Sequence, residues 1–226
     1  MLLEGAAETV RLTACMLALG AALGIPFGVL HVYGPRLLRI VVLDPIVVFF
    51  RGIPTLVLMM IIYFGAANIG LDLSGFLASI FAIGMRSGVY QSQIVRGAIQ
   101  SVASGQMLAG RAIGMSKWQA IRFIVIPQAL RLALPPWSNE YAGVLKESSL
   151  AYALGVTELM RQGRYIVART FGNSLLVYTV CALIYFVLVF VGVRLLRKVE
   201  QRFAVPGFDT APQGRSFFGR DLESSR

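Results

Sequence analysis

Charged and polar residues interrupt the long apolar stretches of this 226-residue chain at only a few places. Arg86 lies in the middle of one stretch, and Asn139 and Glu140 lie in another. A charged side chain at mid-bilayer costs roughly 2.5–3.5 kcal/mol on insertion scales and needs a partner or a water-filled cavity. Two hypotheses are open: a structural Arg86–Glu140 ion pair, or an Arg86 that faces a pathway and binds a carboxylate in bidentate geometry.

Prolines fall in the same stretch as Glu140, at Pro127, Pro135 and Pro136. We expect them to break the backbone hydrogen-bond ladder of this span, because proline has no backbone donor. Irregular backbone at membrane depth is tolerated only inside protein or along a cavity, so residues Trp137–Tyr141 are candidates to line a pathway. The full set of candidate pathway residues is Arg86, Trp137, Asn139, Glu140, Tyr141 and Glu147.

A polar, basic segment lies between two of the apolar stretches. Ser104-Gly105 precedes a short run, Gln106–Ile113, that we expect to be a helix. Gly114 can adopt the left-handed conformation that ends a helix, and Ser116 is placed to cap the next helix from Lys117 onward. The segment therefore predicts a helix-turn-helix that leads into the membrane.

The short helix has a nearly smooth surface at Ala109 and Gly110. Such a helix can lie in a groove of another protein at little steric cost, while Arg111 and Lys117 supply charged contacts. An ordinary amphipathic helix on the membrane surface explains the spacing equally well.

Membrane-spanning helices must position these residues. Hydrophobic residues make up 57% of the chain and charged residues 14%, against about 45–50% and 25% in soluble domains. Because a span needs about 20 apolar residues, we expect an all-α membrane protein with five spans. They run over about Ala7–Val32, Asp44–Ala67, Ser74–Val95, Phe123–Leu145 and Leu175–Val193.

Two of these spans carry special features. Gly20, Gly24 and Gly28 put small residues on one face of the first span and permit close helix approach. The second span is interrupted by Arg51-Gly52-Ile53-Pro54, and the apolar runs on either side are too short to cross alone. We expect the two parts to share one crossing.

The basic residues predict the orientation, with the N-terminus outside and the C-terminus in the cytoplasm. Arg161, Arg164 and Arg169 break this rule, and an amphipathic helix over Val156–Ala168 could hold them at the lipid headgroups. The net charge of +10 then fits contact with anionic membrane lipid, and we expect no nucleic-acid partner. Residues 1–202 would form the membrane domain, with a cytoplasmic loop over about 96–122, and 203–226 a loosely ordered cytoplasmic tail.

Several other functions find no support in the sequence. The chain has no G-x-x-x-x-G-K-[ST] loop, so we expect no ATP hydrolysis by this subunit. A lone His31 does not predict a metal site. Cys15 and Cys181 lie inside apolar runs and read as small hydrophobic residues.

The loop segment from Gln106 to Arg131 resembles the Glu-Ala-Ala loop of ABC-importer permeases for polar amino acids, with Ala109, Gly110, Gly114, Ile124 and Pro127 matching its pattern. Phe50–Pro54 resembles that family's Phe-Arg-Gly-Thr-Pro. Leu134–Pro136 and Leu145–Leu150 resemble its Leu-Pro-Pro and Leu-Lys-Asp-Thr-Ser-Leu. The likeness covers roughly residues 5 to 200.

The chain departs from this family's motifs at three positions, where Val48, Gln93 and Leu108 stand in place of glutamates. Leu108 removes the leading glutamate of the loop. Either apolar contact replaces its salt bridge to the ATPase, or a second, different permease subunit binds the ATPase more strongly.

The resemblance implies a type I ABC-importer permease similar to those of histidine, glutamine and arginine importers, in a prokaryotic inner membrane. It implies that loop 101–115 docks into a separate ATPase subunit, which binds ATP and Mg. It further implies a second permease subunit, an external substrate-binding protein and an amino-acid substrate. The implied coupling residues are Ser104, Gly105, Ala109, Gly110, Arg111, Gly114 and Lys117. An ion-coupled secondary transporter of small polar solutes is the alternative.

Overall fold

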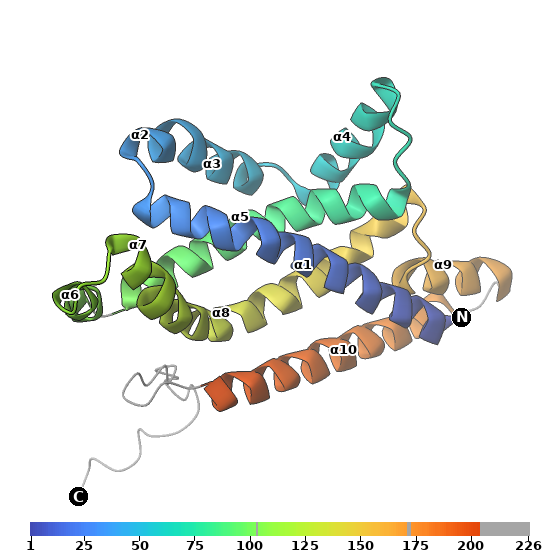
Figure 1. Cartoon of the computed structure of the whole chain (residues 1–226). Helices are drawn as coiled ribbons and strands as arrows, with labels where there is room; N and C mark the ends of the chain where they lie inside the picture. The colour runs from blue at the N-terminus through green and yellow to red at the C-terminus, as the bar shows by residue number, and fades with distance from the viewer. Residues whose placement is uncertain (103, 171–172, 204–226) are drawn as a thin grey trace, which may run out of the picture.

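The computed structural model describes residues 1–102, 104–170 and 173–203, and these residues form helices joined by short connections (Figure 1). The helices are α1 (Leu2–Tyr33), α2 (Arg36–Leu38), α3 (Asp44–Gly52), α4 (Thr55–Asn68), α5 (Gly75–Ser101), α6 (Ser104–Ala112), α7 (Lys117–Ala120), α8 (Ile126–Glu147), α9 (Leu159–Thr170) and α10 (Ser174–Phe203). π-Helical turns, Arg39–Leu43 and Ile121–Val125, join α2 to α3 and α7 to α8, and a 3-10 helix, Ser148–Leu154, follows α8. The all-helical expectation is confirmed for these residues. The expected tail lies outside them after Phe203.

The centre of the fold is the close packing of α1 on α5. The small residues Gly20, Gly24 and Gly28 are buried, as the sequence predicted. A Cβ atom on Gly24 would lie 2.6 Å from the carbonyl oxygen of Gly88 on α5. The two backbones therefore touch, which only small residues permit.

Two described helices, α1 and α10, are long and apolar enough to cross a membrane. The α2–α3 and α4 segments meet at an angle of 105° and could form a third span if the bent pair crosses as one. The expected interruption at Arg51–Pro54 is therefore present as a sharp bend. α5 and α8 have 27 and 22 residues, lengths suited to a span, but they contain more polar side chains.

α8 does not break where its prolines led us to expect. The helix continues through Pro135 and Pro136 from Ile126 to Glu147. A proline inside a helix removes one hydrogen bond and can be tolerated where neighbouring helices support the backbone. α5 and α10 both pack against α8. Pro127 directly follows the π-helical turn Ile121–Val125, which runs into α8 without a break, so its missing donor lies inside a continuous helical segment.

The two ends of the molecule carry different elements. α6, α7 and the C-terminal end of α10 lie at one end, while the N-terminus and α9 lie at the other (Figure 1). α9 corresponds to the expected amphipathic helix. Arg161 does not reach outward from it, because its guanidinium donates to the Tyr152 carbonyl and to the Tyr165 hydroxyl. Arg164 and Arg169 are exposed.

A buried carboxylate holds α9 in place. Glu158 accepts hydrogen bonds from the backbone N–H groups of Met160 and Arg161 and from the Tyr185 hydroxyl on α10. Burial raises the pKa of the Glu158 carboxyl above its ordinary value, and these hydrogen bonds oppose the shift. Glu158 therefore joins the start of α9 to α10.

The α1–α5 contact can be tested with one methyl group. Gly24→Ala should destabilise the detergent-purified protein by about 1–3 kcal/mol, because the new methyl overpacks a backbone contact. Gly97→Ala is the matched control, since nothing lies within 4 Å of a Cβ atom at that position. Thermal unfolding of both variants is the measurement. Equal melting temperatures would contradict the close approach of α1 and α5.

Candidate functional site

Arg86 forms its ion pair with Glu147 on α8. Its Nη1 atom lies 2.7 Å from both Glu147 carboxylate oxygens, and the two side chains are only 21% and 27% exposed. The expected Arg86–Glu140 pair is therefore wrong. Glu140 instead accepts a hydrogen bond of 2.7 Å from the Ser87 hydroxyl.

The direction of helical side chains explains this partner choice. Side chains on a helix tilt toward its N-terminus, so Arg86 points toward the start of α5. α5 and α8 run antiparallel (Figure 1), which brings the C-terminal end of α8, with Glu147, to the guanidinium. We call the α5–α8 contact formed by Arg86, Ser87, Glu140 and Glu147 the charged seam.

The bend between α3 and α4 lies against the charged seam. The guanidinium carbons of Arg86 and Arg51 lie 4.7 Å and 5.2 Å from the centre of the Tyr90 ring. Thr55, the first residue of α4, forms a side-chain hydrogen bond with Glu147. Sequence reasoning missed Tyr90, although its spacing of one helical turn from Arg86 was a usable signal.

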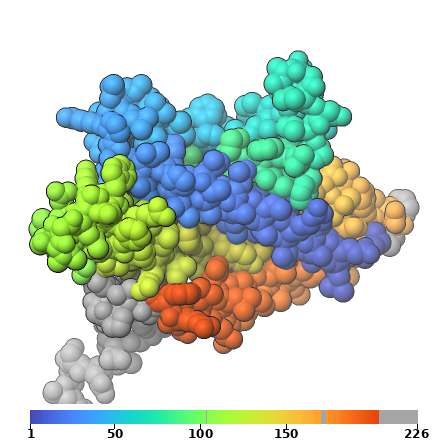
Figure 2. Space-filling view, viewed as in Figure 1, coloured from blue at the N-terminus to red at the C-terminus, as the bar shows by residue number. Residues whose placement is uncertain are grey.

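The remaining candidate pathway residues lie on other faces of α8. Trp137 and Tyr141 line a groove of about 430 Å³ with residues of α1 and α10, and Figure 2 shows the recess between those two helices. The Tyr141 hydroxyl donates to the Leu188 carbonyl at 3.0 Å. Asn139 is exposed and lines a separate hollow that includes Arg197 of α10. The structure thus brings together Arg86, Glu140 and Glu147 and places the other three candidates elsewhere.

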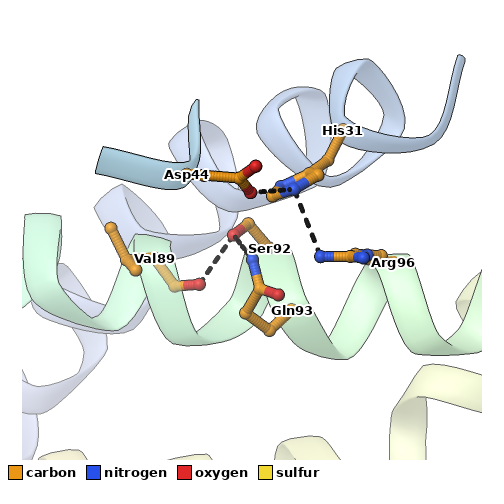
Figure 3. A network of polar contacts seen from close by, with 6 residues as sticks. All are labelled: His31, Asp44, Val89, Ser92, Gln93 and Arg96. Carbon is orange, nitrogen blue, oxygen red and sulfur yellow. Dashed lines mark hydrogen bonds and ion pairs between the residues drawn. The ribbon is translucent and has the colours of Figure 1, made fainter. Parts of the chain in front are cut away.

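A second polar network joins α1, α3 and α5 nearer the α6 end (Figure 3). His31 is buried, and its Nε2 atom lies 2.9 Å from Asp44 Oδ1 and 3.2 Å from Arg96 Nη1. A ring nitrogen either donates or accepts, so Nε2 bonds Asp44 or Arg96 and not both at once. No sequence pattern predicts this grouping, because its three members are far apart along the chain.

The helix-turn-helix has the predicted local geometry. Gly114 has a φ of +91° and ends α6. Ser116 caps α7 in a reciprocal arrangement with Gln119, in which each side chain accepts from the other residue's backbone N–H. The predictions for both residues are confirmed.

The smooth surface of α6 differs from the one expected. Gly110 is buried, and a Cβ atom there would lie 2.5 Å from Cδ1 of Ile124, because α6 folds back onto the turn before α8. The expectation that Gly110 lies on the exposed surface is therefore wrong. The outward face consists of Gly105, Leu108, Ala109 and Ala112. Ser104, Arg111, Gly114 and Lys117 are also exposed.

Comparison with known proteins identifies the family. Residues 20–205 match the family model described as binding-protein-dependent transport system inner membrane component, and the chain belongs to that family. The glutamine transport system permease protein GlnP of Escherichia coli strain K12 is 36% identical over 207 residues, covering 91% of this chain and 94% of that protein. The octopine transport system permease protein OccQ of Rhizobium radiobacter is 37% identical over 164 residues, covering 67% and 69%.

Solved structures agree. The crystal structure of an amino acid ABC transporter with histidines superposes with a TM-score of 0.80 at 31% identity, covering 89% of this chain and 93% of that one. An inward-facing MetNI methionine ABC transporter shares the fold, with a TM-score of 0.76 at 22% identity and coverage of 91% and 97%. The chain is thus a multi-pass inner-membrane permease subunit, and the ATPase and binding protein of its system are separate chains. This excludes the ion-coupled alternative.

The charged seam predicts a specific rescue. Arg86→Ala should destabilise the protein, because it leaves the Glu147 carboxylate without its counter-charge. The loss should stay below the roughly 3–5 kcal/mol of a fully buried pair. Adding Glu147→Ala should restore much of the stability, whereas adding Glu140→Ala should not. Thermal unfolding of the single and double variants checks this, and rescue by Glu140→Ala alone would contradict the pairing.

Proposed function

We propose that this permease carries polar amino acids into the cell as part of an ABC importer. Its relatives named above include permeases for glutamine and octopine, and the 31%-identical solved structure is an amino acid transporter. The similarity to GlnP over 91% of the chain is the observation that carries this proposal.

We further propose five spans of the type I importer arrangement, with the N-terminus outside and the C-terminus in the cytoplasm. α1, the bent α2–α4 segment, α5, the α7–α8 segment and α10 supply them. α5 and α8 can enter the membrane because the Arg86 charge is compensated by Glu147. The C-terminal end of α10 lies near the same end as α6 (Figure 1), and that part of the helix carries Arg194, Arg197 and Lys198, as a cytoplasmic end requires.

In this arrangement α6 docks into a groove of the ATPase subunit, which alone binds ATP and Mg. Ala109, Ala112 and Gly105 offer a surface without long side chains, and Arg111 and Lys117 supply charge at its edge. Leu108 is 68% exposed, which supports apolar contact in place of the family's glutamate. A second permease subunit, identical or different, completes the pathway, and an external binding protein delivers the substrate.

The proposed pathway runs along the charged seam. Glu140 and Glu147 share one face of α8, seven residues apart. The α3–α4 bend lies beside Glu147 through Thr55 and against α5 through Arg51 over Tyr90. Charged groups at membrane depth mark substrate pathways in transport proteins. ATP binding would close the ATPases and turn the permease pair from inward-facing to outward-facing.

The docking of α6 gives a direct test of the proposed function. Ala109→Arg should abolish co-purification of the co-expressed ATPase and uptake of labelled L-glutamine, L-histidine and L-arginine, because the bulky side chain blocks the groove. Gln201→Arg adds the same charge to an exposed site on α10 and should leave both unchanged. Full transport by the Ala109 variant would refute the docking site. Absence of uptake of all three amino acids by the wild-type importer would refute the substrate class.

A further inference from the structure

Arg51 has no counter-charge within the described part of the chain. It is exposed and is the second-to-last residue of α3, with its guanidinium over the Tyr90 ring at 5.2 Å. Among residues 1–102, 104–170 and 173–203 it forms no hydrogen bond or ion pair. Its five N–H donors therefore have no acceptor in the described part of the chain.

The neighbouring charged groups are already engaged. Glu147 uses both carboxylate oxygens on Arg86 and also bonds Thr55. Glu140 accepts from Ser87. Arg86 is neutralised by its own partner, whereas Arg51, beside the charged seam, has no ion pair with any described residue.

The position of Arg51 in the fold makes its lack of a counter-charge informative. The α3–α4 bend lies beside the middle of α5, about halfway between the α6 end and the α9 end (Figure 1). A guanidinium at that depth needs an anion or a water-filled cavity. The C-terminal dipole of α3 and the face of Tyr90 both stabilise the positive charge. Neither supplies a pair of coplanar acceptors for the guanidinium N–H groups.

Space for a ligand exists on this side of the chain. No described residue lies within 4 Å of a Cβ atom built at Gly52, next to Arg51, or at Gly143, between the two carboxylates on α8. Arg51 itself is exposed, and Tyr90 restricts where its guanidinium can point.

We propose that Arg51 binds the α-carboxylate of the amino acid in transit and that Tyr90 positions its guanidinium for this contact. The planar fork of a guanidinium matches a carboxylate in bidentate geometry. Because Arg86 is already paired with Glu147, it is then a structural residue of the site. This role rests on the proposed function, because it requires an amino-acid substrate.

The test measures binding to the permease–ATPase complex in nanodiscs without the binding protein. The probes are L-glutamine, L-histidine and L-arginine, each compared with its α-carboxamide, which keeps the shape and loses the negative charge. The wild-type complex should bind one acid at least about tenfold more tightly than its amide, the size expected of a charge-assisted pair. Arg51→Gln should remove that preference, and Arg51→Lys should retain part of it.

Arg11→Gln is the matched control, since Arg11 is also exposed and lies over an aromatic ring, that of Phe76 at 4.9 Å. It should keep the wild-type preference. Retained discrimination between acid and amide in Arg51→Gln would overturn the proposal. If that variant also lost the permease pair, Arg51 would serve the contact between subunits instead. If the wild-type importer takes up an amino acid in the uptake assay described above, yet the nanodisc complex shows no acid-over-amide preference, only the Arg51 role fails. If the wild-type importer takes up none of the three, the proposed function fails and the Arg51 role fails with it.

Discussion

The Arg86–Glu147 ion pair is the interaction on which the membrane part of this protein depends. In the proposed arrangement α5 spans the bilayer, where an arginine needs a partner, and Glu147 supplies both carboxylate oxygens to it. The pair fixes the register of α5 against α8, since Ser87 then meets Glu140. It also anchors the α3–α4 bend through Thr55. Polar side chains of α5, α8 and the α3–α4 bend are thereby joined at one place.

Features set by local chemistry could be predicted from the sequence. The glycine stripe of α1, the left-handed Gly114 and the Ser116 cap each depend on a few neighbouring residues, and the structure shows all three. The partner of Arg86 could not be predicted in the same way. Glu140 and Glu147 share one face of α8, and choosing between them requires the antiparallel register of two distant helices. The burial of Gly110 likewise depends on how α6 folds back onto Ile124. The proline positions misled because packing by α5 and α10 supports a helix that an isolated segment would break.

α5 connects the two regions that a transport cycle must couple. It runs without interruption from Gly75 to Ser101, past the charged seam and the His31–Asp44–Arg96 network, and α6 begins at Ser104. A movement imposed on α6 by an ATPase would therefore act directly on the helix that holds Arg86 and Tyr90. The broken α3–α4 segment contacts α5 where Arg51 lies over Tyr90 and contacts α1 through Asp44 and His31, so it is the element placed to move with α5.

The central claim is that the pathway runs along the α8 face of Glu140 and Glu147, and cysteine accessibility in membranes tests it most directly. Gly143→Cys would be introduced with Cys15 and Cys181 replaced by alanine, because a Cβ atom at Gly143 meets nothing within 4 Å. Leu183→Cys is the control, because Leu183 is an apolar residue of α10 that is 59% exposed. A membrane-impermeant thiol reagent should modify Gly143→Cys in the assembled importer, more slowly with transported amino acid present, and should leave Leu183→Cys unmodified. Protection of Gly143→Cys together with modification of Leu183→Cys would contradict the account.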